Sequence, residues 1–461
     1  MRAEQEAALG FPAGASSEAP ASAERGLFGH PKGLAFIVAT ETWERFSFYG
    51  MQALLVLYMS NYLLHPGAIE GVAGFGAFRA ALESVTGPLS TEALATQIFG
   101  LYGGLTYITP IIGGVIGDSR FGRKRTVALG AIIMMIGHFL MAIEAAFLPA
   151  LACLLTGCGL LKGNLPTQLG ELYAANDRRR DGAFSLYYVG INAGAFVAPL
   201  LCGTLGELVG WHWGFGAAGV GMAVGLVIYL IGLPHMPADS HGESGEQRAW
   251  RPGDSTALAA LLVMLVVASL FWTSVTQVWN TYSLWVRDYV ARDAFGFTAP
   301  VTWFQSLNSL FVLAMAPVVM LIWRAQAKRK GEPIDLTKIA QGCAATALAL
   351  SVIAASNLFS HGDVPMAWLG LFALISSIGY LHVAPVAIAL FSRASPPKLA
   401  GAVIGIYYVS IFIGSTTSGW LGRFYETLPP AVFWFMHAAI AALASVVTLI
   451  FHRPLRHALR L

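Results

Sequence analysis

Three ionisable side chains fall within five residues of an apolar segment, in the stretch ETWERFSFYG (residues 41–50). On an α-helix Glu41, Glu44 and Arg45 would occupy positions i, i+3 and i+4, so they would lie on one side, to which Gln52 returns. An isolated charge at the centre of a bilayer costs about 2.5–3.5 kcal/mol, so such groups face a partner or water. Two acids and one base leave one carboxylate to pair elsewhere or to take up a proton. The cluster predicts a proton-binding site, and a static ion network that locks the helix in place is the alternative.

A lysine lies in the middle of another apolar segment, in GCGLLKGNLP. An ammonium at that depth needs a counter-charge, and the unpaired glutamate of residues 41–50 is the natural partner. Lys162 is therefore interpreted either as a structural partner only, or as a group that binds a substrate carboxylate once that glutamate is protonated.

A third charged group lies at the junction of two apolar segments, in GGVIGDSRFGRKRT. Asp118 ends the first segment, Gly122 turns the chain, and a basic run that begins at Arg123 opens the second segment. An acid beside a helix N-terminus and a basic run suits a tight cytoplasmic turn that makes and breaks contacts. An ordinary basic loop on the cytoplasmic side of a membrane is the equal alternative.

The composition places these groups in a membrane protein. Of the 461 residues, 56% are hydrophobic and 11% are charged, against about 25% charged in a typical soluble domain. The four cysteines all lie in apolar segments without metal-ligand spacing, and we interpret them as buried thiols. Because no nucleophile–base pair or metal-ligand set is visible, we predict neither an enzyme nor a cofactor or metal, and protons are the expected coupling ion.

The apolar segments predict an all-α membrane protein with twelve transmembrane helices, since about 20 apolar residues cross a bilayer. Their approximate ranges are 34–63, 92–117, 123–145, 147–169, 184–207, 211–234, 255–286, 301–324, 336–358, 365–392, 400–422 and 430–452. An amphipathic stretch over 66–88 is expected at the outer surface. The predicted organisation is one six-helix bundle over 33–234, a second over 255–453, and a charged Pro- and Gly-rich linker over 235–254.

The distribution of basic residues predicts the orientation. With the N-terminus inside, 21 of the 28 Lys and Arg residues fall in cytoplasmic segments and 4 fall on the opposite side. The positive-inside rule therefore makes both terminal tails, 1–32 and 454–461, cytoplasmic. The N-terminal tail has no apolar core and is not interpreted as a cleavable signal peptide. We expect a multi-pass plasma-membrane protein, in the inner membrane of a bacterium, that acts as a monomer without nucleic acid.

Several motifs in order along residues 33–425 resemble the proton-coupled oligopeptide transporters of the major facilitator superfamily. ETWERFSFYG is similar to the family's E-x-x-E-R-F-x-Y-Y signature, and GDSRFGRKR resembles the superfamily's loop between helices two and three. GLLKGN, GELYAANDRRRDGAFSLYYVGINAGAFVAPLLCG and GWHWGFG resemble helices four to six of the family, and FQSLNSLF and GSTTSGWLG resemble its second half. The resemblance implies the major facilitator fold and the import of di- and tripeptides with protons by alternating access. It also implies that the helix pair often inserted between the halves of bacterial members is absent.

The resemblance further implies roles for individual residues. Proton coupling would fall to Glu41, Glu44, Arg45 and Lys162. Arg45 and Lys162 would attract the peptide carboxylate, and Asn192 and Asn308 would hydrogen-bond the peptide backbone or amine. The other residues implied to bind substrate are Tyr49, Gln52, Tyr102, Trp272, Thr276, Tyr380 and Tyr407.

Three positions depart from the family's pattern. The family usually carries an arginine at the position of Gln52 and a glutamate at that of Thr276, which form a gating ion pair, and a glutamate facing the peptide amine at that of Tyr380. Because both members of the pair are replaced, no orphan charge remains, and the outer gate is expected to close by other contacts. The amine is left to neutral groups, or the preferred cargo differs. His382 is a further titratable candidate, but it lies about 200° around the helix from Tyr380 and is expected to face elsewhere.

Two other functions fit the same sequence. One is a proton-coupled carrier or exporter of another small anionic or amphipathic compound, which acid-driven uptake of a dipeptide would distinguish from a peptide importer. The other is a membrane peptide sensor, which would bind peptide without flux. The titratable cluster favours a coupled carrier, because a receptor does not need such a site within the membrane.

Overall fold

The structure is a computed structural model that describes residue 26 and residues 29–174, 176–239, 253–294, 296–331, 333–360, 362–396 and 400–459. Most of the predicted tail 1–32 and of the predicted linker 235–254 lies outside these described residues, as do the last two residues of the tail 454–461.

The described chain is built from helices. In chain order the α-helices are α2 (Lys32–Tyr58), α3 (Phe75–Thr86), α4 (Thr91–Asp118), α5 (Arg123–Leu140), α6 (Phe147–Lys162), α7 (Leu165–Glu171), α8 (Arg179–Thr204), α9 (Trp211–Gly232), α10 (Asp254–Val275), α11 (Thr281–Tyr289), α12 (Trp303–Lys330), α13 (Asp335–Phe359), α14 (Ala367–Arg393), α15 (Ala400–Leu421), α16 (Pro430–Ile450) and α17 (His452–Ala458). Short helical turns extend or join them: η3 (Met59–Leu63), η4 (Ile69–Gly71), η5 (Glu144–Ala146), η6 (Leu205–Val209), η7 (Leu233–His235), η8 (Thr276–Trp279) and η10 (Gly422–Phe424).

Strands in the described residues are limited to two-residue pairings in loops. β1 (Val290–Ala291) runs parallel to β4 (Val364–Pro365), and β2 (Asp293–Ala294) runs antiparallel to β3 (Phe297–Thr298). The prediction of an all-α protein is therefore confirmed, because these short pairings only tie loops together.

Nine helical stretches of the described residues are long and apolar enough to cross a membrane. Large apolar side chains on these helices point outward, and Val115 and Ile450 are 69% and 68% exposed. Exposed apolar surface on this scale is typical of contact with lipid. The chain is therefore a multi-pass membrane protein, as its composition predicts.

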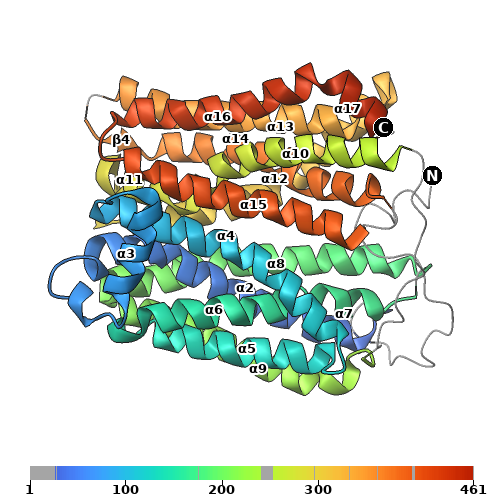
Figure 1. Ribbon diagram of the computed structural model, residues 1–461, viewed down its shortest axis with the longest axis horizontal. Helices are drawn as coiled ribbons and strands as arrows, with labels where there is room; N and C mark the ends of the chain where they lie inside the picture. Colours follow the sequence, from blue (N-terminus) through green and yellow to red (C-terminus); the bar gives the residue numbers. More distant parts are fainter. Residues whose placement is uncertain are drawn as a thin grey trace.

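The long helices lie side by side in two groups (Figure 1). Helices α2 and α4–α9 occupy the lower half of the view, and helices α10–α17 occupy the upper half. The most extensive contacts between the groups are those of α4 with α15 and of α8 with α12, and α11 also packs against α2. The loops gather at two ends of the molecule, which we call the α3 end, on the left in Figure 1, and the α7 end, on the right.

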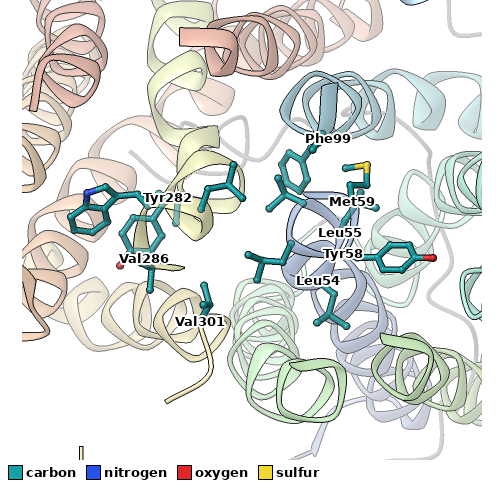
Figure 2. Packing of buried hydrophobic residues seen from close by; sticks show 14 of the residues in the cluster. Leu54, Leu55, Tyr58, Met59, Phe99, Tyr282, Val286 and Val301 are labelled. Carbon is teal, nitrogen blue, oxygen red and sulfur yellow. The ribbon is translucent and has the colours of Figure 1, made fainter. Parts of the chain in front are cut away.

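Apolar packing joins the two helix groups at the α3 end. One cluster of buried side chains contains Leu54 of α2, Phe99 of α4 and Tyr282 of α11 (Figure 2). Two further clusters each draw their buried members from one group, from residues 34–236 in one case and from residues 260–459 in the other. The buried core is therefore shared between the groups at the α3 end and divided elsewhere.

Two of the predicted spans are interrupted. The predicted span 255–286 divides into α10, η8 and α11, and the predicted span 147–169 divides into α6 and α7. Irregular backbone at membrane depth is tolerated where it is buried in protein or lines a cavity. Thr276 and Val278 of η8 do line the cavity at the centre of the molecule.

The predicted amphipathic stretch 66–88 contains α3. Of the 12 residues of this helix only Phe75 is buried, so α3 lies on the surface of the molecule at the end that bears its name.

Candidate functional site

Glu41, Glu44 and Arg45 of α2 form a buried charged cluster. Arg45 Nε donates a hydrogen bond to Glu41 Oε1 at 2.9 Å and lies 2.5 Å from Glu44 Oε2. All three side chains are buried, and within the described part of the chain Glu41 Oε2 and Glu44 Oε1 have no hydrogen-bond partner. One guanidinium thus serves two carboxylates. Because the second negative charge is incompletely compensated, the cluster can hold a proton on one carboxylate.

Lys162 ends α6 and presents a buried ammonium. Among the described residues its Nζ has no hydrogen-bond partner, and it lies 3.9 Å from the ring centroid of Tyr107 and 5.3 Å from that of Phe48. The ion pair expected between Lys162 and a glutamate of α2 is therefore not formed in this structure. A cation–π contact contributes about 2 kcal/mol when desolvated, which is less than the effective cost of burying an ion. Lys162 is consequently a cation that can accept a carboxylate.

A central cavity takes its lining from both helix groups. The lining residues before position 240 are Phe48, Tyr49, Gln52, Gly103, Thr106, Tyr107, Tyr188, Ile191, Asn192 and Ala195. Those after position 253 are Trp272, Val275, Thr276, Val278, Trp279, Asn308, Ser309, Val312, Tyr380, Ile411 and Ser415. An apolar and aromatic wall with a few amides and hydroxyls is typical of a small-molecule site.

The predicted substrate-site residues divide into two sets. Those that line the cavity are Tyr49, Gln52, Asn192, Trp272, Thr276, Asn308 and Tyr380. Arg45, Lys162, Tyr102 and Tyr407 do not line it. The Tyr407 hydroxyl donates to the Ala384 carbonyl oxygen at 3.3 Å, and the Tyr102 hydroxyl is buried without a hydrogen-bond partner among the described residues. Both tyrosines pack within helix interfaces, so their roles in binding remain predictions.

Several lining residues were missed by the sequence analysis although their spacing could have revealed them. Trp279 follows Trp272 and Thr276 at positions i, i+4 and i+7, which places the three on one side of a helix. Tyr188 precedes Asn192 by four residues in the same way. Tyr107 carries no such signal, because its neighbour Lys162 comes from another helix.

The positions that depart from the family's pattern meet in this cavity. Gln52 and Thr276 line it from opposite helix groups, and the Thr276 hydroxyl lies 3.4 Å from that of Ser415. Gln52 Oε1 is buried and has no hydrogen-bond partner in the described ranges of the chain. Because both side chains are neutral, they cannot form an ion pair that closes the molecule. Closure therefore depends on other contacts.

His382 faces α12 and does not line the cavity. Trp323 Nε1 donates to His382 Nε2 at 3.1 Å, and His382 Nδ1 donates to the Ile378 carbonyl oxygen at 2.8 Å. The side chain of Tyr380, two residues earlier, lines the cavity. His382 is therefore not placed to replace an acid at Tyr380.

An arginine joins the two helix groups at the α3 end. Arg287 of α11 donates from Nη2 to Glu92 Oε1 of α4 at 3.0 Å and from Nη1 to Ser60 Oγ of η3 at 2.7 Å. Its Nε also donates to Asp288 Oδ1 at 2.6 Å, and Asp288 accepts from the Tyr425 hydroxyl at 2.8 Å. This network supplies a charged contact between the groups that Gln52 and Thr276 lack.

A glutamate makes a second contact between the groups at the same end. Glu207 of η6 accepts hydrogen bonds from the backbone N–H groups of Val301 and Thr302 at 2.8 and 2.9 Å, and from the Thr302 hydroxyl at 2.8 Å. Val301 and Thr302 directly precede α12. A carboxylate from one helix group thus caps a helix of the other, where the helix dipole favours a negative charge.

The predicted loop motif lies at the α7 end and forms a network within one helix group. Arg123 Nη2 lies 2.5 Å from Asp118 Oδ1, and Arg123 Nη1 also pairs with Glu171 of α7. Gly122 has φ of +84°, a conformation that glycine adopts without strain. In the other group Arg393 pairs with Asp335. These pairs hold each group together at this end without linking the two groups.

Comparison with known proteins gives one consistent family. The POT family profile matches residues 124–249 and 247–435. The chain is 31% identical to the peptide transporter YePEPT of Yersinia enterocolitica, over 86% of this chain and 88% of that protein. It is 26% identical to a di-/tripeptide transporter of Lactococcus lactis subsp. cremoris, over 94% of this chain and 97% of that protein.

The fold gives the same result. A crystal structure of a mutant peptide transporter POT in complex with alafosfalin matches with a TM-score of 0.81 and 27% identity, over 99% of both chains. These related proteins are transporters, which confirms the prediction that the chain is not an enzyme. The profile covers more than half of the sequence, and the chain therefore belongs to the POT family.

Proposed function

We propose that this protein is a proton-driven symporter that imports di- and tripeptides by alternating access. The observation that carries the proposal is the placement of four buried charges beside one cavity. Glu41, Glu44 and Arg45 form a cluster in which one base serves two acids, while Lys162 has no carboxylate partner among the residues that the structure describes. The related proteins named as peptide transporters support the class of cargo.

The proposed architecture is the major facilitator fold, with twelve transmembrane helices in two six-helix bundles over 33–234 and 255–453. Helices α2, α5 and α15 lie alongside the nine apolar stretches and would complete the twelve. The three charges within α2 and the basic residues that open α5 explain why composition alone does not select these two helices. The linker 235–254 is too short to hold an additional helix pair.

The proposed orientation places the α7 end and both termini in the cytoplasm, because the basic loops lie at that end. The α3 end would then face the outside. The contacts of Arg287 and Glu207 across the groups support a conformation that is closed to the outside. A single chain carries the whole site, so the proposed functional unit is a monomer.

The cycle begins when a proton from the outside neutralises Glu44 or Glu41. Arg45 then loses one of its two carboxylate partners, and either Arg45 or Lys162 binds the carboxylate of the cargo. Asn192 and Asn308 hydrogen-bond the peptide backbone. Binding lets the two bundles rock about the cavity, with the family's expected gate at Asp118, Gly122 and Arg123 making and breaking contacts at the cytoplasmic side. Loss of the proton to the cytoplasm restores the cluster and expels the cargo.

The energies allow a single proton to drive accumulation. One charge that moves through 100 mV provides about 2.3 kcal/mol. A tenfold concentration ratio of cargo requires about 1.4 kcal/mol. No other coupling ion or cofactor is needed.

Reconstitution in liposomes tests the proposal. With an acidic exterior, labelled dipeptide should accumulate inside, and dissipating the pH gradient should abolish the accumulation. Glu44→Gln should lose acid-driven accumulation but retain exchange of labelled for unlabelled dipeptide, since exchange needs no net proton movement. The matched control is Glu83→Gln, which changes a partly exposed acid of α3 away from the cavity.

Three results would contradict the proposal. Acid-driven loss of dipeptide from preloaded vesicles would indicate an exporter. Binding without flux would indicate a sensor. Unchanged acid-driven uptake in Glu44→Gln and in the corresponding Glu41→Gln variant would show that the cluster does not couple proton movement to uptake.

A further inference from the structure

No charged side chain among the described residues lines the central cavity, but a cation, Lys162, lies directly behind its wall. Within the described residues, its lining contains no Asp, Glu, Lys or Arg side chain. The two acids of the α2 cluster, Glu41 and Glu44, are buried against Arg45 and do not line the cavity. Lys162, by contrast, contacts two lining rings, those of Phe48 and Tyr107.

An ammonium group in this cavity would have only neutral neighbours. The aromatic faces of Trp272, Tyr188 and Tyr380 could contact it, and the hydroxyl and amide oxygens could accept its hydrogen bonds. The free energy gained from these contacts is smaller than the free energy needed to desolvate an unpaired ion. The free α-amino group of an ordinary peptide is therefore unfavourable in this site.

The wall does offer groups that suit an amide. Gln52 Oε1 is a buried acceptor to which no described residue donates a hydrogen bond, and it belongs to a side chain that lines the cavity. An acylated nitrogen keeps one N–H to donate to such an acceptor, and its carbonyl oxygen can accept from Asn192 or Asn308. A neutral amide thus satisfies the polar groups of the wall without an unpaired charge. An ammonium would be buried there at a net cost in free energy.

The charge balance leads to the same class of cargo. The cluster of α2 together with Lys162 has two acids and two bases, so one proton leaves the site with a charge of +1. A cargo that carries one carboxylate and no ammonium neutralises that charge. A zwitterionic peptide does not, because its own charges cancel.

We propose that the preferred cargo is an N-acylated peptide, a small amide-containing monocarboxylate whose amino end is uncharged. This inference rests on the proposed function of proton-driven import. It narrows the cargo from peptides in general to peptides whose amine is capped.

Uptake of three probes in acid-outside liposomes tests the inference: Ala-Ala, N-acetyl-Ala-Ala and Ala-Ala amide. We expect a KM for N-acetyl-Ala-Ala that is about tenfold lower than for Ala-Ala, and no acid-driven uptake of the amide, which lacks a carboxylate. A KM for N-acetyl-Ala-Ala equal to or above that of Ala-Ala overturns the inference while leaving proton-driven import in place. Absence of acid-driven uptake of all three probes overturns both.

An added acid in the cavity should reverse the preference. Asn308→Asp keeps the size of a lining side chain and supplies a carboxylate to an ammonium. In this variant we expect the ratio of the KM for N-acetyl-Ala-Ala to the KM for Ala-Ala to rise at least about tenfold. Asn357→Asp is the matched control, because Asn357 of α13 accepts a hydrogen bond from Trp285 and does not line the cavity. An unchanged ratio in Asn308→Asp, or an equal rise in the control, contradicts the inference.

Discussion

At the scale of single residues, Lys162 and Arg45 are both buried cations of the same membrane-embedded site, but they differ in their partners. Arg45 is held by two carboxylates of its own helix, 2.5 and 2.9 Å from its Nε. Lys162 is held by aromatic faces and by no carboxylate of the described residues. Because an ion pair must be broken before Arg45 can bind cargo, Lys162 is the cation that binds a carboxylate at lower cost.

Replacement of Lys162 should therefore abolish transport. Lys162→Ala removes the charge beside the cavity, and we expect acid-driven dipeptide uptake to fall at least about 100-fold, since truncating a buried charged partner costs about 3–5 kcal/mol. Initial uptake rates in liposomes measure the effect. Lys338→Ala is the matched control, because Lys338 also lies over an aromatic ring, 4.4 Å from the Trp323 centroid, and does not line the cavity. Uptake by Lys162→Ala within a few-fold of the unmodified protein would exclude the proposed carboxylate site.

At the scale of helices, the α3 end is closed by close packing as well as by charge. Helices α4 and α15 come from different groups and cross at two glycines, Gly100 and Gly419. A Cβ atom on Gly100 would lie 2.7 Å from the Gly419 Cα atom and would also overlap the Ser415 carbonyl oxygen. Because backbone atoms cannot move aside as a side chain can, this crossing requires glycine, and small residues commonly mediate such approaches in membranes.

Gly100→Ala should separate α4 from α15 at the α3 end. We expect it to disfavour the closed conformation and to reduce transport at least about tenfold, while binding of cargo from the outside is retained. Liposome uptake together with a binding measurement on detergent-solubilised protein distinguishes the two effects. Gly114→Ala in the same helix is the control, because its added Cβ would meet no atom within 4 Å. Equal losses in both variants would indicate a general defect of α4.

The ion pair of Arg287 should contribute to the same closure. Arg287→Ala removes donors to Glu92 and Ser60 of the other group, and hydrogen bonds to charged groups contribute about 1.5–3 kcal/mol each. We expect the population that is open at the α3 end to rise about tenfold. Distances between spin labels at Ile143 and Phe359, in a protein whose four native cysteines are replaced by alanine, measure that population.

The control for this measurement is Arg79→Ala. Arg79 pairs with Glu83 at 2.9 Å within α3, so the pair lies at the same end of the molecule but does not join the two groups. A distance distribution that changes equally in both variants, or in neither, would show that Arg287 does not close the α3 end.

At the scale of the whole molecule, the number of charges moved in the proposed one-proton cycle depends on the cargo. A zwitterionic dipeptide imported with one proton carries a net charge of +1 inward. An N-acylated dipeptide imported with one proton carries none. The membrane potential should therefore act on one cargo and not on the other.

This difference can be measured at steady state. A potential of 100 mV, negative inside, should raise the accumulation of Ala-Ala by up to about 40-fold, because about 2.3 kcal/mol is available at about 1.4 kcal/mol per tenfold ratio. It should leave the accumulation of N-acetyl-Ala-Ala unchanged. A potassium gradient with valinomycin imposes the potential, and omission of valinomycin is the control. Equal responses of the two cargoes would contradict the one-proton cycle.

The sequence by itself determined the class of the protein, the order of its main helices and the charged cluster of α2. Long apolar segments must be helical in a membrane because every backbone polar group needs an internal partner, and the i, i+3, i+4 spacing of Glu41, Glu44 and Arg45 brings them together in any such helix. Only the tertiary structure decided which residues line the cavity. Tyr107 contacts Lys162, while Tyr102 of the same helix packs away from the cavity.

The tertiary structure also decided how the molecule closes. Nothing in the spacing of Arg287, Glu92 and Glu207 connects them, because they lie on helices or turns far apart along the chain. The partners of Lys162 and the break of the predicted span 255–286 at η8 depend in the same way on how neighbouring helices pack. Local sequence determines the structure of each helix and the charges that it carries. Contacts between distant helices arise only from three-dimensional packing, so they determine which of those charges meet a partner and which remain available to cargo.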